Sequence, residues 1–235
     1  MLSENLEAVR KNIYESAIAA GTPPDEVTLI AVTKTHGPEL INEVIDLGVT
    51  DIGENKVQEI LEKYDKVKPV RWHLIGHLQT NKVKYIIDKV HMIHSVDSIK
   101  LMNEIERQAV KHDVDMKILI QVNISGEETK FGIRPEEIDE ILTHASTLTR
   151  VKIYGFMTIA PKIDGDMSNR LHFDNIRRIY LDIQSKKYDN VIMQYLSMGM
   201  SGDYQSAIES GSNMVRVGSA IFGERNYTRE NSTAE

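Results

Sequence analysis

The chain has 235 residues, of which 41% are hydrophobic and 27% are charged, and its net charge is −7. This composition is globular, and the length suits one large domain or two small ones. The acidic balance disfavours binding to nucleic acid, which recruits clustered Lys and Arg. The sequence has no cysteine, which excludes disulfides and thiolate catalysis and suits the cytosol. A polar start at Met1–Glu4 and short apolar runs predict neither a signal peptide nor a membrane helix, so we expect a cytoplasmic protein that binds no membrane.

The first segment has the spacing of an amphipathic helix. Its apolar residues recur three or four positions apart, at Leu2, Leu6, Val9, Ile13 and Ala17. Gly21 and then Pro23-Pro24 follow, and we expect the helix to end there because Gly suits a C-cap and Pro cannot continue a helix.

Beyond this helix, short β-branched runs alternate with amphipathic segments. We expect strands at Val27–Lys34, Asp51–Glu54, Arg71–Gly76, His91–Val96, Met116–Ile124, Val151–Ile159, Val191–Met198 and Met214–Phe222. We expect helices between them at Glu39–Leu47, Lys56–Tyr64, Asn81–Asp88, Ile99–His112, Glu136–Ala145, Asn169–Lys186 and Tyr204–Glu209.

This strict alternation predicts a parallel sheet covered by helices. Eight strands can close into a barrel that has no sheet edge, so we predict a single α/β domain, a (β/α)8 TIM barrel with an extra N-terminal helix. A doubly wound open sheet is the alternative that periodicity leaves open. No linker divides residues 1–225, and we expect residues 226–235 to form a polar, disordered tail.

The first strand ends in a lysine. Functional groups in such barrels lie at the C-terminal ends of the strands. Because side chains alternate along a strand, Ile30, Val32 and Lys34 share one face. If this face is the barrel interior, burial favours the neutral Lys34 amine and prepares it to form a Schiff base. The alternative is that Lys34 simply reaches water, as strand-ending lysines usually do.

Two loops rich in Gly and Ser follow the last two strands. Gly199–Asp203 comes after the seventh strand, and Gly218-Ser219 lies in the eighth. Small residues at a helix start expose backbone N–H groups to an anion, and phosphate sites in barrels are often built from these two loops together. Each turn alone could be a mere connection. Together, opposite Lys34, they predict a phosphorylated carbonyl compound bound as an imine.

Arg216 lies two residues before Gly218 and therefore shares its inward parity. An arginine inside a barrel needs a carboxylate partner or a polar ligand, because an unpaired buried charge is costly. We weigh two roles about equally: contact with the bound ligand, and a structural ion pair with a core carboxylate such as Glu54.

Several stretches of the sequence occur in the same order in a known family. They are Ala31–Lys34, Gly53–Glu59, Trp72–Lys82, Gln121–Ile124, Lys130–Gly132, Gly155–Met157, Leu196–Ser201 and Met214–Gly223. By this ordered set, which runs from the first strand to the last, the chain resembles the YggS/PROSC family of pyridoxal-phosphate homeostasis proteins. The fold that the resemblance implies is the barrel domain of alanine racemase.

The resemblance implies a bound cofactor, pyridoxal 5′-phosphate (PLP), and roles for individual residues. Lys34 would hold PLP as a Schiff base, and Arg216 would face the pyridine nitrogen. Asn55, in the Gly-Glu-Asn loop, and Met157, at the end of the sixth strand, would line the cofactor's face.

The resemblance also assigns the phosphate group of the cofactor. Ser201, Gly218 and Ser219 would form its cradle, and Ser197 would lie nearby. Ser219 stands where the family also uses Thr, a replacement that keeps the hydroxyl group. These residues come from the two loops that small residues already mark as an anion site.

The same family suggests a carrier of PLP rather than an enzyme. Alanine racemases have a further β-domain that supplies catalytic groups, and we expect none here because few residues follow Gly223. An arginine donates to the ring nitrogen and leaves it without its own proton, so the ring is a weaker electron sink. We therefore expect a monomer that binds PLP without substantial catalysis and has PLP-dependent apo-enzymes as candidate recipients. A small amino-acid racemase and a Schiff-base aldolase acting on a sugar phosphate remain as alternatives.

Two further features are given weaker roles. His73 and His77 would share a strand face, and His91 and His94 lie close in sequence, but no metal-binding pattern joins them. We therefore expect histidines that line the barrel or lie on the surface, and no metal. Lys130 falls in a polar loop within a family-matching stretch, and a secondary role in cofactor handover is a hypothesis.

Overall fold

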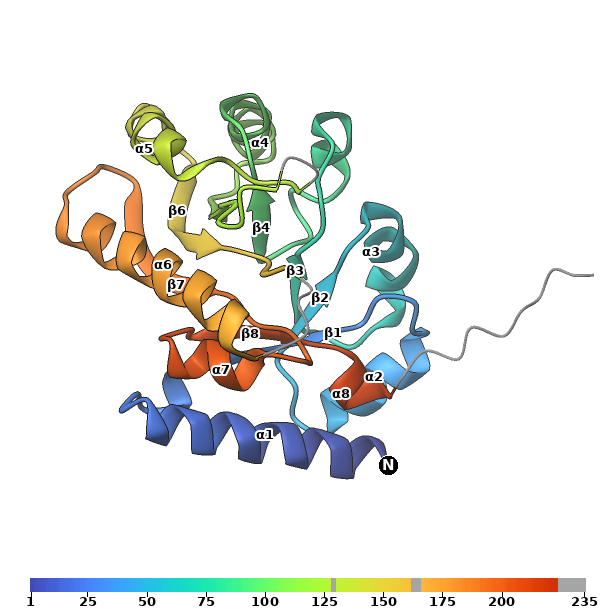
Figure 1. The fold of residues 1–235 in the computed structure, drawn as a ribbon. Helices are drawn as coiled ribbons and strands as arrows, with labels where there is room; N and C mark the ends of the chain where they lie inside the picture. Colours follow the sequence, from blue (N-terminus) through green and yellow to red (C-terminus); the bar gives the residue numbers. More distant parts are fainter. Residues whose placement is uncertain (128–129, 162–165, 224–235) are drawn as a thin grey trace, which may run out of the picture.

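The computed structural model describes residues 1–127, 130–161 and 166–223, which form one closed barrel (Figure 1). Its eight strands run in sequence order, each parallel to the next, and the last pairs with the first. They are β1 Thr28–Val32, β2 Asp51–Glu54, β3 Arg71–Leu74, β4 Met92–Val96, β5 Met116–Gln121, β6 Val151–Met157, β7 Val191–Ser197 and β8 Met214–Val217. The open-sheet alternative is therefore wrong. The predicted domain limit at 225 and the predicted tail 226–235 lie outside the described residues.

Helices surround this barrel where the sequence predicts them. They are α1 Leu2–Ala19, α2 Pro38–Asp46, α3 Val57–Lys63, α4 Ile99–His112, α5 Ile138–Ala145, α6 Asp166–Ser185, α7 Tyr204–Glu209 and α8 Ser219–Phe222. The helix predicted at Asn81–Asp88 is a 3₁₀ helix at Thr80–Tyr85. Among the described residues no helix combines the length and the apolar character that a membrane crossing would need.

The predicted last strand is wrong in its second half. We expected a strand at Met214–Phe222, but β8 ends at Val217. The N–H groups of Ile221 and Phe222 both donate to the carbonyl of Gly218, so the chain turns into the short helix α8. Four apolar or small residues in a row cannot distinguish a buried strand from a buried helical turn. The consequence is that the Gly218 loop is a strand-to-helix turn.

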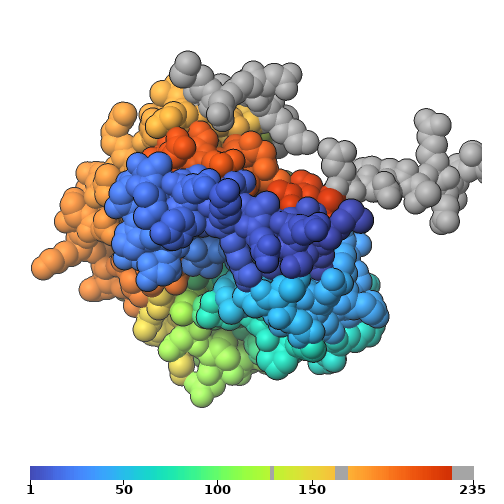
Figure 2. All heavy atoms as spheres, turned by 90° about the horizontal axis from the view of Figure 1, so that it is seen from below, coloured from blue at the N-terminus to red at the C-terminus, as the bar shows by residue number. Residues whose placement is uncertain are grey.

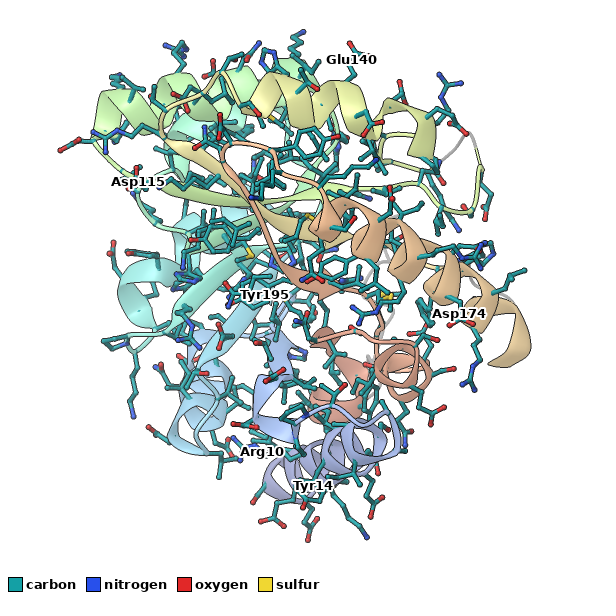
Figure 3. All side chains as sticks on the ribbon, turned by 90° about the vertical axis from the view of Figure 1, so that its left-hand side faces the viewer. Arg10, Tyr14, Asp115, Glu140, Asp174 and Tyr195 are labelled. Carbon is teal, nitrogen blue, oxygen red and sulfur yellow. The ribbon has the colours of Figure 1, made fainter. Side chains whose placement is uncertain are left out.

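The barrel interior holds a small apolar cluster in addition to the larger core between strands and helices. Its buried members are Ile30, Met92, Leu119, Met157 and Met214. Tyr154 and Tyr195 pack against it, and Figure 3 shows Tyr195 near the centre of the molecule. The predicted parity of the first strand is confirmed, because Ile30 lies in this interior cluster while Ala31 belongs to the outer core.

Gly155 reverses the alternation of β6. Tyr154 and Met157 both contact the interior cluster, whereas Phe156 belongs to the outer core. The register of β6 shifts at this point against both neighbouring strands. Gly155 has a φ of +147°, and a Cβ there would lie 1.7 Å from the carbonyl oxygen of Tyr195. A glycine bulge therefore turns Met157 into the barrel.

Helix α1 lies outside the barrel and packs against the two short C-terminal helices (Figure 1). Figure 2 shows α1 crossing the face seen from below, with the red C-terminal segment along one side of it. The Asn12 amide donates to the Tyr204 hydroxyl of α7 at 2.9 Å, and the Asn5 amide donates to the Ile221 carbonyl of α8 at 3.0 Å. The N-terminal helix thus fixes α7 and α8, whose preceding loops are the predicted anion site.

Replacing Gly155 by Ala is expected to destabilise the protein by about 3 kcal/mol or more, because the new Cβ meets a backbone oxygen and the positive φ becomes strained. For a chain of this length the thermal midpoint should fall by roughly 10 °C. Gly202→Ala is the control, since nothing lies within 4 Å of a Cβ there and its φ is not positive. Equal midpoints for the two variants in a calorimetric scan would contradict this account of β6.

Candidate functional site

A cavity of about 310 Å³ lies at the C-terminal ends of β1 and β8. Pockets for small molecules span about 300–1,000 Å³, so its size suits a compact ligand. Six of the eight predicted cofactor residues line it: Lys34, Asn55, Ser201, Arg216, Gly218 and Ser219. They come from the ends of β1, β2, β7 and β8 and from the loops that follow them. The strand-end rule therefore brings most of the predicted site together.

The loop that carries Lys34 is held from both sides. Thr33 donates its hydroxyl to Glu54 Oε1 at 2.7 Å, and its carbonyl accepts from Lys63 Nζ at 3.1 Å. Thr35 donates its backbone N–H to Glu59 Oε2 at 2.7 Å and has a φ of +69°, which is strained for a β-branched residue. The positions before and after Lys34 are thus fixed by three charged side chains of β2 and α3.

Glu54 and Lys63 form the buried centre of this clamp. Lys63 Nζ lies 2.8 Å from Glu54 Oε1 and 2.8 Å from Glu59 Oε2, and the Glu54 side chain is fully buried. Burial raises the pKa of Glu54 above its usual range, against the opposing effect of the hydrogen bonds from Lys63 and Thr33. Burial acts in the same direction on Glu59, but Lys63 and the Thr35 N–H outweigh it and lower the pKa of Glu59. Lys63 therefore keeps Glu54 from being an uncompensated buried carboxyl.

The two Gly/Ser loops meet at Ser201. Its Oγ accepts hydrogen bonds from the backbone N–H of Gly218 at 3.0 Å and of Ala220 at 3.3 Å, which leaves its own hydroxyl hydrogen to donate. A Cβ at Gly218 would lie 3.3 Å from the Cβ of Val32, so glycine allows a close approach between the two loops and β1. The loop pair is suited to an anion such as a phosphate group.

Arg216 is 4% exposed and is one of the residues that line the cavity. Nη1 donates to Ser197 Oγ at 2.5 Å, and Nη2 donates to the carbonyl of Thr158 at 2.8 Å. Burial lowers the pKa of Arg216 to about 10, so the guanidinium is still protonated at pH 7. The alternative of an ion pair with Glu54 is wrong, because the partner of Glu54 is Lys63. Contact between Arg216 and a bound ligand stays a prediction.

Two predicted cofactor residues are not in the cavity lining. Met157 belongs to the apolar cluster inside the barrel, and Ser197 is fully buried with its hydroxyl bonded to Arg216. Asn55 does line the cavity, and its backbone packs closely against Gly76, where a Cβ would lie 2.3 Å from the Asn55 carbonyl oxygen. Met157 and Ser197 thus support the site from below.

Sequence reasoning missed several residues of the cavity. His36, which stacks on Phe222 with ring centroids 4.5 Å apart, lines it together with Ile75 and Ile159. All three lie just beyond strand ends. A search extended four residues past each strand would have found them.

The remaining histidines and Lys130 lie elsewhere. His77 falls beyond β3 and stacks on Phe131, so the expectation that it shares a strand face with His73 is wrong. His73 and His94 line the barrel interior and are buried. Lys130 pairs with Glu127 at 2.7 Å. Within the described part of the chain no three His, Asp or Glu side chains are grouped as metal ligands would be.

Comparison with known proteins extends these observations. The family model of the alanine racemase N-terminal domain matches residues 5–226. A pyridoxal phosphate homeostasis protein of Aquifex aeolicus is 42% identical over 226 residues, which cover 95% of this chain and 98% of that protein. The structure of PipY from Synechococcus elongatus with PLP bound is 31% identical, covers 95% of this chain and 100% of PipY, and superposes with a TM-score of 0.82.

An alanine racemase of Clostridium difficile shares the barrel alone. It is 15% identical, and the match covers 97% of this chain and 57% of the racemase with a TM-score of 0.71. Together with the closed eight-stranded barrel and helix α1, these matches confirm the predicted alanine racemase type of fold. At this identity the likeness concerns the fold and carries no conclusion about racemase chemistry.

Lys63→Met is expected to destabilise the protein by about 3 kcal/mol or more, because it leaves Glu54 buried without its partner. The control is Lys68→Met, which removes the pair of Lys68 with Asp46, whose side chains are 50% and 59% exposed. An exposed pair contributes about 1 kcal/mol at most. Urea unfolding measures both variants, and similar losses for the two would contradict the role assigned to the clamp.

Proposed function

The chain belongs to the family of pyridoxal phosphate homeostasis proteins, and from this premise we propose that it holds PLP on Lys34 in the cavity between β1 and β8 and takes part in PLP homeostasis without substantial catalysis. One observation carries the proposal: an amine, a protonated guanidinium and an anion cradle converge on a single cavity of suitable size. These three groups match the aldehyde, the ring nitrogen and the phosphate of PLP.

Lys34 is the residue proposed to attach the cofactor. PLP supplies an aldehyde, with which a neutral primary amine condenses to a Schiff base with loss of water. The clamp of Glu54, Lys63 and Glu59 fixes the backbone on both sides of Lys34 and so restricts where its amine can lie in the cavity. A fixed loop favours attachment because less conformational freedom is lost on binding.

Arg216 supports binding without turnover. It faces the cavity as a protonated donor, so the ring nitrogen opposite it would accept a hydrogen bond and carry no proton of its own. An unprotonated ring withdraws electrons weakly, which disfavours transamination, whereas racemases abstract an α-proton with an arginine in this place. The site therefore suits a cofactor that is retained and released unchanged.

The phosphate is proposed to lie at the joined loops. The Ser201 hydroxyl, the Ser219 side chain and the backbone around Gly218 line that part of the cavity. Helix α1 braces both helices that follow these loops, through Tyr204 and Ile221. Helix α1 thus holds the two helices that follow the proposed anion subsite.

We place this activity in the cytoplasm, where a chain without cysteine is suited to reducing conditions. The proposed partners are PLP and, as recipients, PLP-dependent apo-enzymes, and the proposed assembly state is a monomer. The net charge of −7 disfavours binding to nucleic acid.

Borohydride trapping tests the proposal. After incubation with PLP and reduction, mass spectrometry of the digested protein should find the pyridoxyl group on the Lys34 peptide, and the visible absorbance band of the Schiff base should disappear. Lys34→Ala should show neither the band nor the modified peptide.

The control is Lys100→Ala, an exposed lysine of α4 on the side of the barrel opposite the β8–β1 seam. This variant should carry the pyridoxyl group on Lys34 to the same extent as the wild type. Labelling of Lys34→Ala to the wild-type extent would overturn the proposal. A sugar phosphate that forms an imine in the absence of a visible band would favour the aldolase alternative instead.

A further inference from the structure

A row of hydrogen-bonded side chains runs through the barrel interior below the cavity. Arg216 Nη1 donates to Ser197 Oγ at 2.5 Å, and Ser197 Oγ lies 3.3 Å from His94 Nδ1. His94 Nε2 lies 2.9 Å from His73 Nδ1, and His73 Nε2 lies 2.9 Å from Asp51 Oδ1. These five residues, which we call the polar row, come from β8, β7, β4, β3 and β2. The row connects the cavity with the opposite, N-terminal end of the barrel, where Asp51 begins β2.

Every member of the polar row is buried, with at most 4% of its surface exposed. Of these five residues, Asp51 also forms an ion pair with a side chain at the surface. Arg71 donates to its two carboxylate oxygens at 2.7 and 2.5 Å, and the Arg71 side chain is 53% exposed. The row therefore begins at a surface ion pair on one end of the barrel and ends at the cavity on the other.

The carboxylate of Asp51 imposes one direction on the hydrogen bonds of the polar row. A guanidinium can only donate, so Ser197 Oγ accepts from Arg216 and keeps its own hydroxyl hydrogen available for His94 Nδ1. A carboxylate can only accept, so His73 must donate from Nε2 to Asp51. Neutral His94 then carries its hydrogen on Nε2 and donates to His73 Nδ1. The Asp51 end therefore sets the direction, and His94 Nδ1 is left to accept the Ser197 hydroxyl hydrogen, which the Arg216 end allows.

The protonation states that this arrangement needs are favoured at pH 7. Burial lowers the pKa of His73 and of His94, so both rings are neutral. Burial alone would raise the pKa of Asp51, but hydrogen bonds from His73 and Arg71 outweigh it and hold the pKa well below the usual range. The opposite direction would require a proton on Asp51, which its ion pair with Arg71 opposes.

We propose that Asp51 is a remote positioning residue for Arg216, acting through His73, His94 and Ser197 to fix the direction in which the guanidinium is held against the cavity. The row and its direction follow from the contacts alone, whereas the effect on the cofactor's ring nitrogen rests on the function proposed above. Asp51 touches neither the cavity nor its lining loops, so its influence has to pass along the row.

Nitrogen NMR of the PLP-free protein with ¹⁵N-labelled histidine tests the direction. In the wild type at pH 7, His73 and His94 should both carry hydrogen on Nε2 and lack it on Nδ1. Asp51→Asn keeps the shape but lets the side chain donate as well as accept, so Nδ1–H forms should appear in both rings. Nδ1–H forms in the wild type, or an unchanged pattern in the variant, would overturn the inference.

The same proteins loaded with PLP labelled at its ring nitrogen test the effect on the cavity. A donor on the ring nitrogen moves its ¹⁵N resonance upfield of free pyridine, so Asp51→Asn should move it back downfield and weaken PLP binding by about tenfold, as expected for a perturbed hydrogen bond to a charged group. Asp115→Asn is the matched control: Asp115, labelled in Figure 3, precedes β5 with its side chain 61% exposed and lies outside the row. An equal response of both variants, or a response of neither, would contradict the proposal.

A second variant covers the case in which Asp51→Asn does not fold. Ser197→Ala removes only the link beside Arg216, so His73 and His94 should keep their Nε2–H forms while the ring-nitrogen resonance moves downfield. A resonance that stays in place would show that Arg216 is held independently of the row. Absence of borohydride labelling on wild-type Lys34 would refute the proposed function, but the PLP-free measurement would still decide the direction of the row.

Discussion

The buried guanidinium of Arg216 is the constraint on which the rest of the site depends. At 4% exposure this cation has little contact with bulk solvent, and it forms no ion pair with a carboxylate of the described residues. Its charge is met instead by the Thr158 carbonyl, by the Ser197 hydroxyl and by whatever occupies the cavity. Because an uncompensated charge in a barrel is costly, the interior beneath Arg216 has to be polar, and the row that leads to Asp51 meets that need. An apolar barrel core would leave the guanidinium unsupported.

A second buried charge cluster acts on the other wall of the cavity. Glu54 and Lys63 neutralise each other and hold the loop before Lys34, while Glu59 holds the loop after it. The clamp and the polar row lie on different walls of the cavity and fix different groups. The clamp fixes a backbone so that one amine is presented, and the polar row fixes a side chain so that one donor is presented. Both fix geometry at the cavity with buried hydrogen bonds, as preorganised binding sites do.

The sequence predicts the parts of this site that follow from periodicity. Strand alternation places Lys34 and Arg216 on the inner face, and the small residues at Ser201 and Gly218 mark the anion loops, all of which line one cavity. Motif resemblance supplies the family and the cofactor. These signals are local, because they depend on residues a few positions apart.

Contacts between distant strands could not be predicted in this way. The bulge at Gly155 changes the parity of β6 only because the Tyr195 carbonyl of β7 lies against it. The sequence predicts His73 and His94 only as barrel-lining or surface residues. Their hydrogen bonds to Asp51 and Ser197 depend on how β2, β3, β4 and β7 are arranged in the closed barrel. The pairing of Glu54 with Lys63 rather than Arg216 likewise depends on how α3 packs on β2. A single sequence carries no record of such neighbours.

We propose that this cavity retains PLP and does not use it on amino acids. The direct measurement is proton NMR of the PLP-loaded protein in heavy water with a mixture of L- and D-amino acids, in which each α-proton signal is followed with time. The account predicts that the α-proton signals persist while Lys34 carries the cofactor. Steady loss of an α-proton that disappears in Lys34→Ala would contradict it and identify a racemase-type enzyme.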